Sequence, residues 1–444
     1  MWITNWRFLI VLTGILPFFT ESIANQTLPE STEQVWQVGT GRWDSIQEQH
    51  FAEWVEKTIT EDFFIRYGIA IDCADVPYAT RWIYSRIAHL PAAVTTKDGH
   101  LLGHWSTAWK NLSQAKEWYL DRRFRQSLLS VLSETSTRTL PLDTYPIRIT
   151  TQSLSAGAIF IGDGHAGLVG RIVLDGSTYS PVQTWEATLP RKVQQLRQKS
   201  YFASVTDIDA GNGLVRFRWP MFAAGHWQYL PNRDHPFYSL EQYSQDFSYA
   251  EEVFDQAVAR RIDPKQYEPA MRARLIIDSI YRYLLMRVPI VQEGFNHCRQ
   301  KKCPEGSYLW EVYSTPSRDE MINFEIFHLQ KLIKDNKLDE DALAKTMEER
   351  VIPIAVGQTV TLKYVVQNHD WLSHDPDDSI KARWALAKCG MIRSRIRNSL
   401  GAMGFAEQRY RRNDPEYADR RRDHNISELK FLQDQWKDSG CKDL

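Results

Sequence analysis

The chain has 444 residues, of which 43 % are hydrophobic and 25 % charged, and its formal net charge is −1. A net charge so close to zero argues against a protein that relies on bulk electrostatic attraction to nucleic acid or to anionic membranes. The length and the apolar content suffice for two or three domains that each bury a core.

The first 24 residues have the pattern of a secretory signal peptide. Arg7 precedes an apolar run over residues 8–19, and Ser22 and Ala24 place small side chains where a signal peptidase reads the chain. The run is too short for a comfortable membrane span, which disfavours an uncleaved anchor. We therefore expect cleavage after Ala24 and an exported protein, periplasmic or extracellular, with no membrane span after the signal is removed.

Three helices are expected in the first part of the exported chain. One places residues 51, 54 and 55 on a common face, and the next follows Cys73, has an apolar stripe over residues 79–90 and ends at Pro91. The third is expected over about 105–132. This part of the chain therefore contributes helices rather than strands.

After these helices the pattern changes to short strands. Apolar runs separated by glycine turns lie at 147–149, 158–161, 166–169 and 171–174. Helices followed by antiparallel strands predict an α+β fold.

The later chain is mixed at first and then mainly helical. The sequence predicts a strand at 214–219, helices at 251–259 and 270–286, and a strand-like insert at 358–366 within a helical last third. With boundaries placed near 199 and 317, the expected regions are a first domain over 25–199, a mixed α/β accessory region over 200–316 and a mainly helical C-terminal region over 317–444.

The five cysteines suggest two disulfides and one free thiol. Cys298 and Cys303 flank a short polar loop, and Cys389 and Cys441 both lie in the C-terminal region. Disulfides form readily in exported proteins, so we expect these two pairs to be bridged. Cys73 is then left as an odd thiol, which is either kept for chemistry or simply buried and inert.

Cys73, His165 and Glu186 follow one another in an order that suits nucleophilic catalysis. Cys73 precedes a helix, His165 opens an apolar strand, and Glu186 stands on the next strand-like segment. A thiol is a strong nucleophile only as the thiolate, which a nearby imidazole stabilises. The imidazole in turn needs a third group that fixes its tautomer, and Glu186 is the candidate.

These segments resemble NlpC-type cell-wall peptidases, a branch of the papain-like cysteine peptidases. The matching elements are Tyr67-Gly68, Asp72-Cys73, the strand over 156–161 and the glycine-histidine strand over 164–169. The resemblance covers roughly 64–191, under a third of the chain. It implies a papain-like core, in which a helix packs on an antiparallel sheet, and hydrolysis of amide bonds in peptides of the cell wall. On physical grounds, we expect an oxyanion to be held by the backbone N–H of Cys73 with the Tyr67 hydroxyl.

The chain also departs from this family. Ala74-Asp75 stands where the family has Ser-Gly, a helical insert separates Cys73 from His165, and Glu186 replaces the usual third residue. Transglutaminase-like acyl transferases are a close competitor, because they too begin a helix at a cysteine. Their histidine is usually followed by an aromatic residue, unlike Ala166. A non-catalytic binding or scaffold protein on the same fold is a further alternative.

The start of the helix after Cys73 is open to two interpretations. Asp72 or Asp75 could cap it, and the helix dipole would then favour a thiolate at Cys73. Pro77, however, is comfortable only in the first helical turn. A helix that starts after the cysteine would leave Cys73 in the preceding turn, where it gains less from the dipole.

No other pattern in the sequence predicts a cofactor or a metal. Zinc motifs and phosphate-binding glycine loops are both missing from the sequence. The arginine-rich segment over 409–422 is interleaved with acidic residues, which is typical of a solvated helix. We expect a peptide or cell-wall substrate, no nucleic acid partner, no metal and no cofactor, and the sequence leaves the oligomeric state open.

Overall fold

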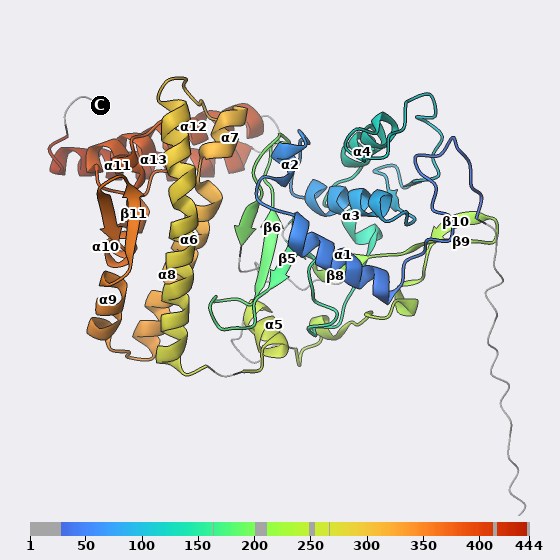
Figure 1. The fold of residues 1–444 in the computed structure, drawn as a ribbon, viewed down its shortest axis with the longest axis horizontal. Coiled ribbons are helices and arrows are strands. Elements are labelled where there is room, and N and C mark those ends of the chain that lie inside the picture. Colours follow the sequence, from blue (N-terminus) through green and yellow to red (C-terminus); the bar gives the residue numbers. More distant parts are fainter. Residues whose placement is uncertain are drawn as a thin grey trace, which may run out of the picture.

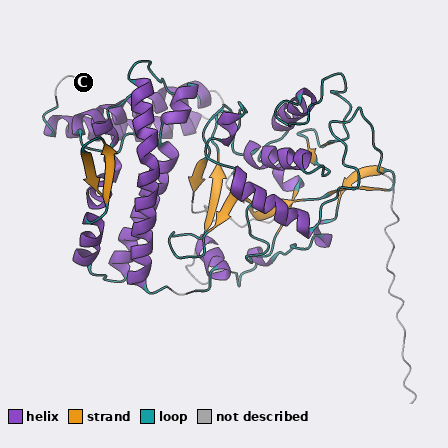
Figure 2. Ribbon diagram, in the orientation of Figure 1, coloured by secondary structure: helices purple, strands orange, loops and turns teal. Residues whose placement is uncertain are grey.

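The computed structural model describes residues 28–162, 164–199, 211–247, 254–265, 267–411 and 415–441. The signal peptide expected over residues 1–24 lies outside the described residues. Figures 1 and 2 show an antiparallel sheet with helices on one side of the molecule and a mainly helical region on the other. The α+β class expected from the sequence is therefore confirmed.

The first part of the chain surrounds a buried helix. The elements are α1 (Ser45–Thr58), α2 (Phe63–Arg66), α3 (Asp75–Ile87), β1 (Ala93–Thr95), β2 (Leu101–Gly103) and α4 (Arg122–Glu134). Every residue of α3 from Asp75 to Ser85 is buried. A helix that is buried on all sides belongs to the interior, so α3 is the central helix of this part.

The main sheet follows in the order β3-β8-β4-β5-β6-β7, with antiparallel pairing throughout. Its strands are β3 (Thr144–Pro146), β4 (Ile159–Gly162), β5 (His165–Ile172), β6 (Val182–Glu186), β7 (Arg197–Lys199) and β8 (Gly213–Phe217). The small hairpin of β9 (Pro220–Ala223) and β10 (His226–Tyr229) follows β8, and α5 (Phe254–Ile262) comes after it.

Alternation along the strands buries both faces of the sheet. Ile159 and Leu168 belong to the same buried cluster as Ala79 and Ile83 of α3. Phe160 and Val169 point to the opposite face and join a second cluster with residues of α5. The helix after Cys73 is thus packed against the strands that carry His165.

The helical region begins with α6 (Pro269–Cys298), which packs against α8 (Pro316–Asp335) in a common buried cluster. A buried ion pair joins the two helices, since Arg287 Nε lies 2.6 Å from Asp319 Oδ1. The remaining elements are α7 (Tyr308–Tyr313), α9 (Glu340–Glu348), β11 (Val351–Ala355), β12 (Gln358–Thr361), α10 (Leu362–Asn368), α11 (Ile380–Arg383), α12 (Lys388–Tyr410) and α13 (Pro415–Asp438).

Buried clusters cross both of the boundaries expected from the sequence. One cluster combines residues 145–182 with residues 214–262, and another combines residues 273–291 with residues 321–391. The division at 199 and at 316 remains a prediction about domains, but the cores themselves are shared across those positions.

Several expected elements differ from the structure. Residues 166–169 and 171–174 were expected as two strands, but β5 runs through both as far as Ile172. The expected strand at 147–149 is displaced, because β3 ends at Pro146 and Ile147 makes only an isolated bridge with Tyr238. The helix expected over 105–132 begins only at Arg122, where the Asp121 carboxylate accepts the Phe124 N–H at 2.9 Å.

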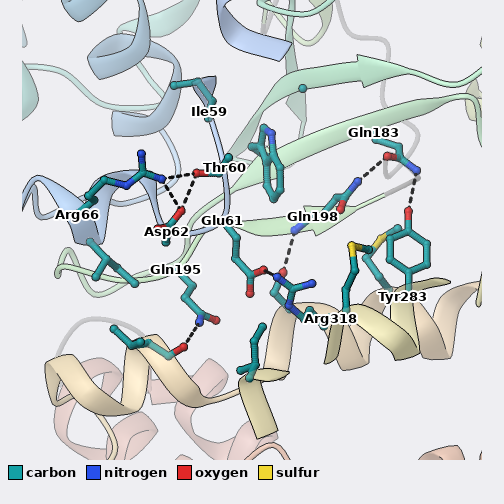
Figure 3. Close-up of a pocket in the computed structure, with 18 of the residues that line it drawn as sticks. Ile59, Thr60, Glu61, Asp62, Arg66, Gln183, Gln195, Gln198, Tyr283 and Arg318 are labelled. Carbon is teal, nitrogen blue, oxygen red and sulfur yellow. Dashed lines mark hydrogen bonds and ion pairs between the residues drawn. The ribbon is translucent and has the colours of Figure 1, made fainter. Parts of the chain in front are cut away.

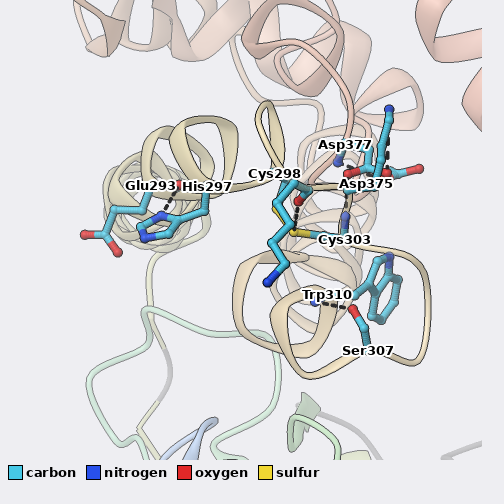
Figure 4. The surroundings of a disulfide bond; sticks show 10 residues. Glu293, His297, Cys298, Cys303, Ser307, Trp310, Asp375 and Asp377 are labelled. Atoms are coloured by element: carbon cyan, nitrogen blue, oxygen red, sulfur yellow. Dashed lines mark hydrogen bonds and ion pairs between the residues drawn. A yellow bond between two sulfur atoms is a disulfide. The ribbon is translucent and has the colours of Figure 1, made fainter.

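Both expected disulfides are present. Cys298, the last residue of α6, is bonded to Cys303, and the Cys303 N–H donates to Asp377 Oδ1 at 2.9 Å (Figure 4). Cys389 of α12 is bonded to Cys441, which follows α13, so the second bridge closes a helical hairpin. Cys73 is free. Two disulfides are compatible with an exported protein, in which thiols meet an oxidising environment.

The described helices were also compared with the requirements of a membrane span. Among them, none combines the necessary length with sufficient apolar character.

Candidate functional site

Cys73 lies in a tight turn just before α3. The helix begins at Asp75, its N-terminal flanking residue is Ala74, and Pro77 falls in its first turn, where a proline is tolerated. Neither aspartate caps the helix as the sequence suggested, and no side-chain cap is seen among the described residues. The Asp75 carboxylate instead accepts the backbone N–H of Asp72 at 2.9 Å, which folds the turn around Cys73.

Arg191 ties this turn to the segment that follows β6. Its guanidinium contacts both oxygens of Asp75, at 2.6 and 3.0 Å, and reaches Asp72 Oδ2 at 3.3 Å. Burial, together with the charge of Asp72, raises the pKa of Asp75 to about 7, and Arg191 opposes this shift. Ile71 and Lys192 also exchange backbone hydrogen bonds, so the chain is fixed immediately before the cysteine.

His165 is the first residue of β5 and faces both of the other predicted site residues. Its Nε2 lies 2.8 Å from Glu186 Oε2, and its ring is close enough to the Cys73 side chain for Cys73 to raise the pKa of His165. Because Nε2 is engaged by the carboxylate, Nδ1 is the ring nitrogen left for the sulfur. Cys73, His165 and Glu186, which are far apart in the sequence, therefore meet.

The pKa of His165 reflects this position. Burial alone would lower it, but the interactions with Cys73 and Glu186 raise it to about 9. The side chain is 34 % exposed, so it remains accessible from outside. At neutral pH the ring is consequently protonated.

Glu186 ends β6 and is held by three partners. Besides His165, its carboxylate accepts the Thr184 hydroxyl at 2.9 Å and lies 3.4 Å from Lys199 Nζ. Burial would raise the pKa of Glu186, but the bond from His165 and the charge of Lys199 outweigh burial and lower it. Glu186 is thus an ionised carboxylate in a 5 % exposed position.

Gly167 makes room for this carboxylate. A Cβ at Gly167 would lie 3.1 Å from both Cγ and Oε1 of Glu186 and 3.3 Å from Cβ of Thr184. Such contacts are too close without a shift of the neighbours. The glycine that follows the histidine by two residues therefore has a steric role in the site.

Tyr67 packs against other aromatic side chains. Its ring lies 4.7 Å from the ring of Trp118 and 5.4 Å from that of Tyr119. The suggestion that the Tyr67 hydroxyl holds an oxyanion remains a prediction.

Sequence reasoning did not identify Thr184, Lys199 and Arg191 as members of the site. Thr184 carried a usable signal, because residues two apart on a strand share a face and Thr184 precedes Glu186 by two. Lys199 and Arg191 carried none, since their partners are set by the pairing of β6 with β7 and by the path of the chain after β6.

One group of side chains has the spacing of a metal site. The Cys298 and Cys303 sulfurs and an Asp377 oxygen lie within 4.8 Å of one another. Both sulfurs are consumed by the disulfide, so this group offers a single carboxylate and does not fit a metal.

Comparison with known proteins gave no significant match, whether to family models, to curated proteins or to solved structures.

Proposed function

We propose that this chain is an exported cysteine hydrolase with a papain-like core, which cleaves amide bonds in peptides of the bacterial cell wall. The observation that carries the proposal is the contact of the His165 ring with Cys73 on one side and with Glu186 on the other. A nucleophile, a base and an orienting carboxylate in mutual contact are the parts that covalent acyl transfer needs.

The chemistry follows from this arrangement. The Cys73 thiolate attacks the amide carbonyl carbon, and the backbone N–H of Cys73, with the N-terminus of α3, stabilises the oxyanion. The His165 imidazolium then gives its proton to the leaving amine as the C–N bond breaks, which leaves a thioester. Water loses a proton to His165, attacks the thioester and releases the acid, and the thiolate is restored.

Glu186 acts by orienting the imidazole. Its carboxylate accepts a hydrogen bond from Nε2, which directs Nδ1 at the sulfur and stabilises the charged ring. Thr184 and Lys199 hold the carboxylate in place from the other side. Such a group is partly replaceable, whereas Cys73 and His165 are both required for turnover.

The choice of cell-wall peptides rests on the short motifs shared with NlpC-type peptidases. A transglutaminase-like acyl transferase would form the same thioester, but its acyl group would then be transferred to an amine instead of to water. The two are distinguished by the products, because hydrolysis yields a free carboxylate and transfer yields a new amide. A non-catalytic binding protein would give neither product.

The first test is alkylation of Cys73 at near-neutral pH, located by peptide mass spectrometry. Cys73 is the one free thiol, and we expect its labelling to slow at least tenfold in His165→Ala, since the thiolate loses its imidazolium partner. His226→Ala serves as the matched control, because that histidine is exposed on β10. Equal labelling of His165→Ala and the unsubstituted chain would contradict activation of the thiol.

The second test is release of fragments from cell-wall peptides. Cys73→Ala should lower the rate by more than about a thousandfold while circular dichroism shows an intact fold. Fragment release that persists in Cys73→Ala would show that another group does the chemistry.

A further inference from the structure

A cavity of about 590 Å³ separates the sheet from the helical region. Residues 59–66, strands β5 and β6 and the chain around β7 form one wall, and helices α6, α7 and α8 form the other (Figure 3). Ligand sites in proteins typically enclose about 300–1,000 Å³, so this volume suits a small molecule or a segment of a polymer.

Three buried polar atoms in the wall of this cavity have no partner within the described residues. They are Glu61 Oε1, Gln195 Oε1 and Arg318 Nε. Glu61 and Arg318 do pair with each other, at 2.5 Å between Oε2 and a terminal guanidinium nitrogen, so one oxygen of the carboxylate remains unused. Gln195 is only 7 % exposed and uses its amide N–H groups on carbonyls of the helical region.

Buried polar atoms without partners are costly, so three of them in the wall of one cavity are informative. Two of the three accept hydrogen bonds and one donates. A ligand that satisfies them must both donate and accept, and hydroxyl groups do both. Burial also raises the pKa of Glu61, because the carboxylate is largely removed from water.

The rest of the lining narrows the class of ligand. Four acidic side chains and three arginines nearly balance in charge, which favours a neutral ligand. The lining also includes the amide groups of Gln183, Gln195 and Gln198 and the aromatic rings of Trp185, Tyr283, Tyr308 and Tyr313. Amide groups and aromatic faces together suit a sugar, whose ring has a hydroxyl edge and an apolar face.

The indole of Trp185 lies in this wall of the cavity. A Cβ at Gly170 would fall 2.6 Å from Cδ1 and Nε1 of the indole, so the indole lies directly against the backbone of β5. Trp185 immediately precedes Glu186, and side chains alternate along a strand. The strand that holds the orienting carboxylate on one face therefore presents its indole on the other.

We propose that this cavity is a saccharide-binding site that takes a short, neutral, N-acetylated oligosaccharide. The choice of an N-acetylated sugar rests on the proposed function, because such sugars form the glycan to which cell-wall peptides are attached. Hydroxyl groups donate to Glu61 Oε1 and Gln195 Oε1 and accept from Arg318 Nε, and a sugar ring packs against the aromatic side chains. The site holds the glycan, and Cys73 and His165 act on the peptide.

The test is calorimetric titration of the whole chain carrying Cys73→Ala with chitotetraose, a neutral tetramer of N-acetylglucosamine. We expect saturable binding that weakens at least tenfold in Glu61→Gln, since the amide keeps the shape but places a donor where a hydroxyl must donate. Glu348→Gln makes the same charge change on the exposed surface of the helical region and should bind as tightly as the parent.

Tyr308→Ala is a second test of the site that does not depend on whether Glu61→Gln folds correctly. Tyr308 lines the cavity but is 61 % exposed, so its removal spares the core, and we expect binding to weaken several-fold. No heat of binding at millimolar sugar, or equal affinity in Tyr308→Ala and the parent, would overturn the proposal. Alkylation of Cys73 in a separate Glu61→Gln chain that keeps the cysteine tests the thiol independently, so loss of sugar binding with a reactive Cys73 leaves the proposed hydrolase standing.

Discussion

His165 is held between a thiol and a carboxylate, and both contacts favour its protonated form. The pKa of about 9 means that the ring carries its proton below that pH and loses it above. The leaving amine needs this proton, so the rate of hydrolysis should fall as the pH rises through about 9.

The shift depends on Glu186, which makes its contribution testable. Glu186→Gln removes the negative charge that stabilises the imidazolium, so the pKa of His165 should decrease. We expect the alkaline limb of kcat/KM against pH to move to lower pH, with a reduced but measurable rate. A limb that stays at the same pH in Glu186→Gln would mean that a different group titrates there.

Gly167 offers a steric test of the same carboxylate. In Gly167→Ala the new Cβ would press on Glu186 and Thr184, and the carboxylate must move away from the imidazole. A displacement of about 1 Å at an orienting group costs on the order of a hundredfold in rate, so kcat should fall by about ten- to a hundredfold.

The matched control for this change is Gly404→Ala. A Cβ at Gly404, in α12, would meet nothing within 4 Å, and alanine favours a helix. We expect kcat of this variant to equal that of the unsubstituted chain. If Gly167→Ala were as active as Gly404→Ala, the close packing around Glu186 would have no bearing on catalysis.

At the scale of elements, the sequence predicted those whose periodicity is set locally. The helix after Cys73, the strand opened by His165 and the strand at β8 all lie where the patterns placed them. Residues 358–366 were expected as a strand-like insert and are rich in β-branched side chains, but α10 begins at Leu362. The buried residues Leu362, Val365 and Val366 have helical spacing, so the period was a better guide than β propensity.

The candidate site was predictable in part for a similar reason. The order of Cys73, His165 and Glu186 along the chain is a feature of the sequence, and the structure brings these residues together. The contacts of Arg191 and Lys199 depend on how the chain returns to the sheet after β6. Such long-range pairing has no local pattern, which is why it could not be read from the sequence.

The turn that carries Cys73 depends on the pair formed by Asp75 and Arg191. Arg191→Met would leave the buried Asp75 carboxylate without its cation, and we expect the free energy of unfolding to fall by about 1–3 kcal/mol. In an Asp75→Asn background the same substitution should cost less, because no buried charge is left unpaired. Urea denaturation of the four chains of this cycle measures the difference.

An equal cost of Arg191→Met in both backgrounds would show that the guanidinium acts through its other partners. Those partners are the Leu132 carbonyl, which accepts from Arg191 at 2.6 Å, and Asp72 Oδ2 at 3.3 Å. The cycle therefore separates the ion pair with Asp75 from these other two contacts.

At the scale of the whole molecule, the helical region is attached to the same segment that fixes the cysteine turn. Glu311 of α7 is buried and accepts from Lys192 Nζ at 2.9 Å and from the Gln195 N–H at 3.2 Å. Lys192 in turn pairs through its backbone with Ile71, two residues before Cys73. A chain of contacts thus leads from α7 to the nucleophile.

If the contacts of Glu311 restrict motion at the site, then removing them should increase the mobility of the turn around Cys73. In Glu311→Ala the carboxylate that holds Lys192 and Gln195 is lost, so we expect faster amide hydrogen exchange over residues 192–198 and 69–75, and a lower kcat/KM. Exchange in α12 and α13 should stay as it was, because the Glu311 carboxylate bonds to Lys192 and Gln195 and to no described residue of either helix. Glu348→Ala, which removes an exposed glutamate of the same region, should change neither exchange nor rate. Unaltered exchange over 69–75 in Glu311→Ala would mean that the turn around Cys73 is held by Arg191 and the sheet without help from the helical region.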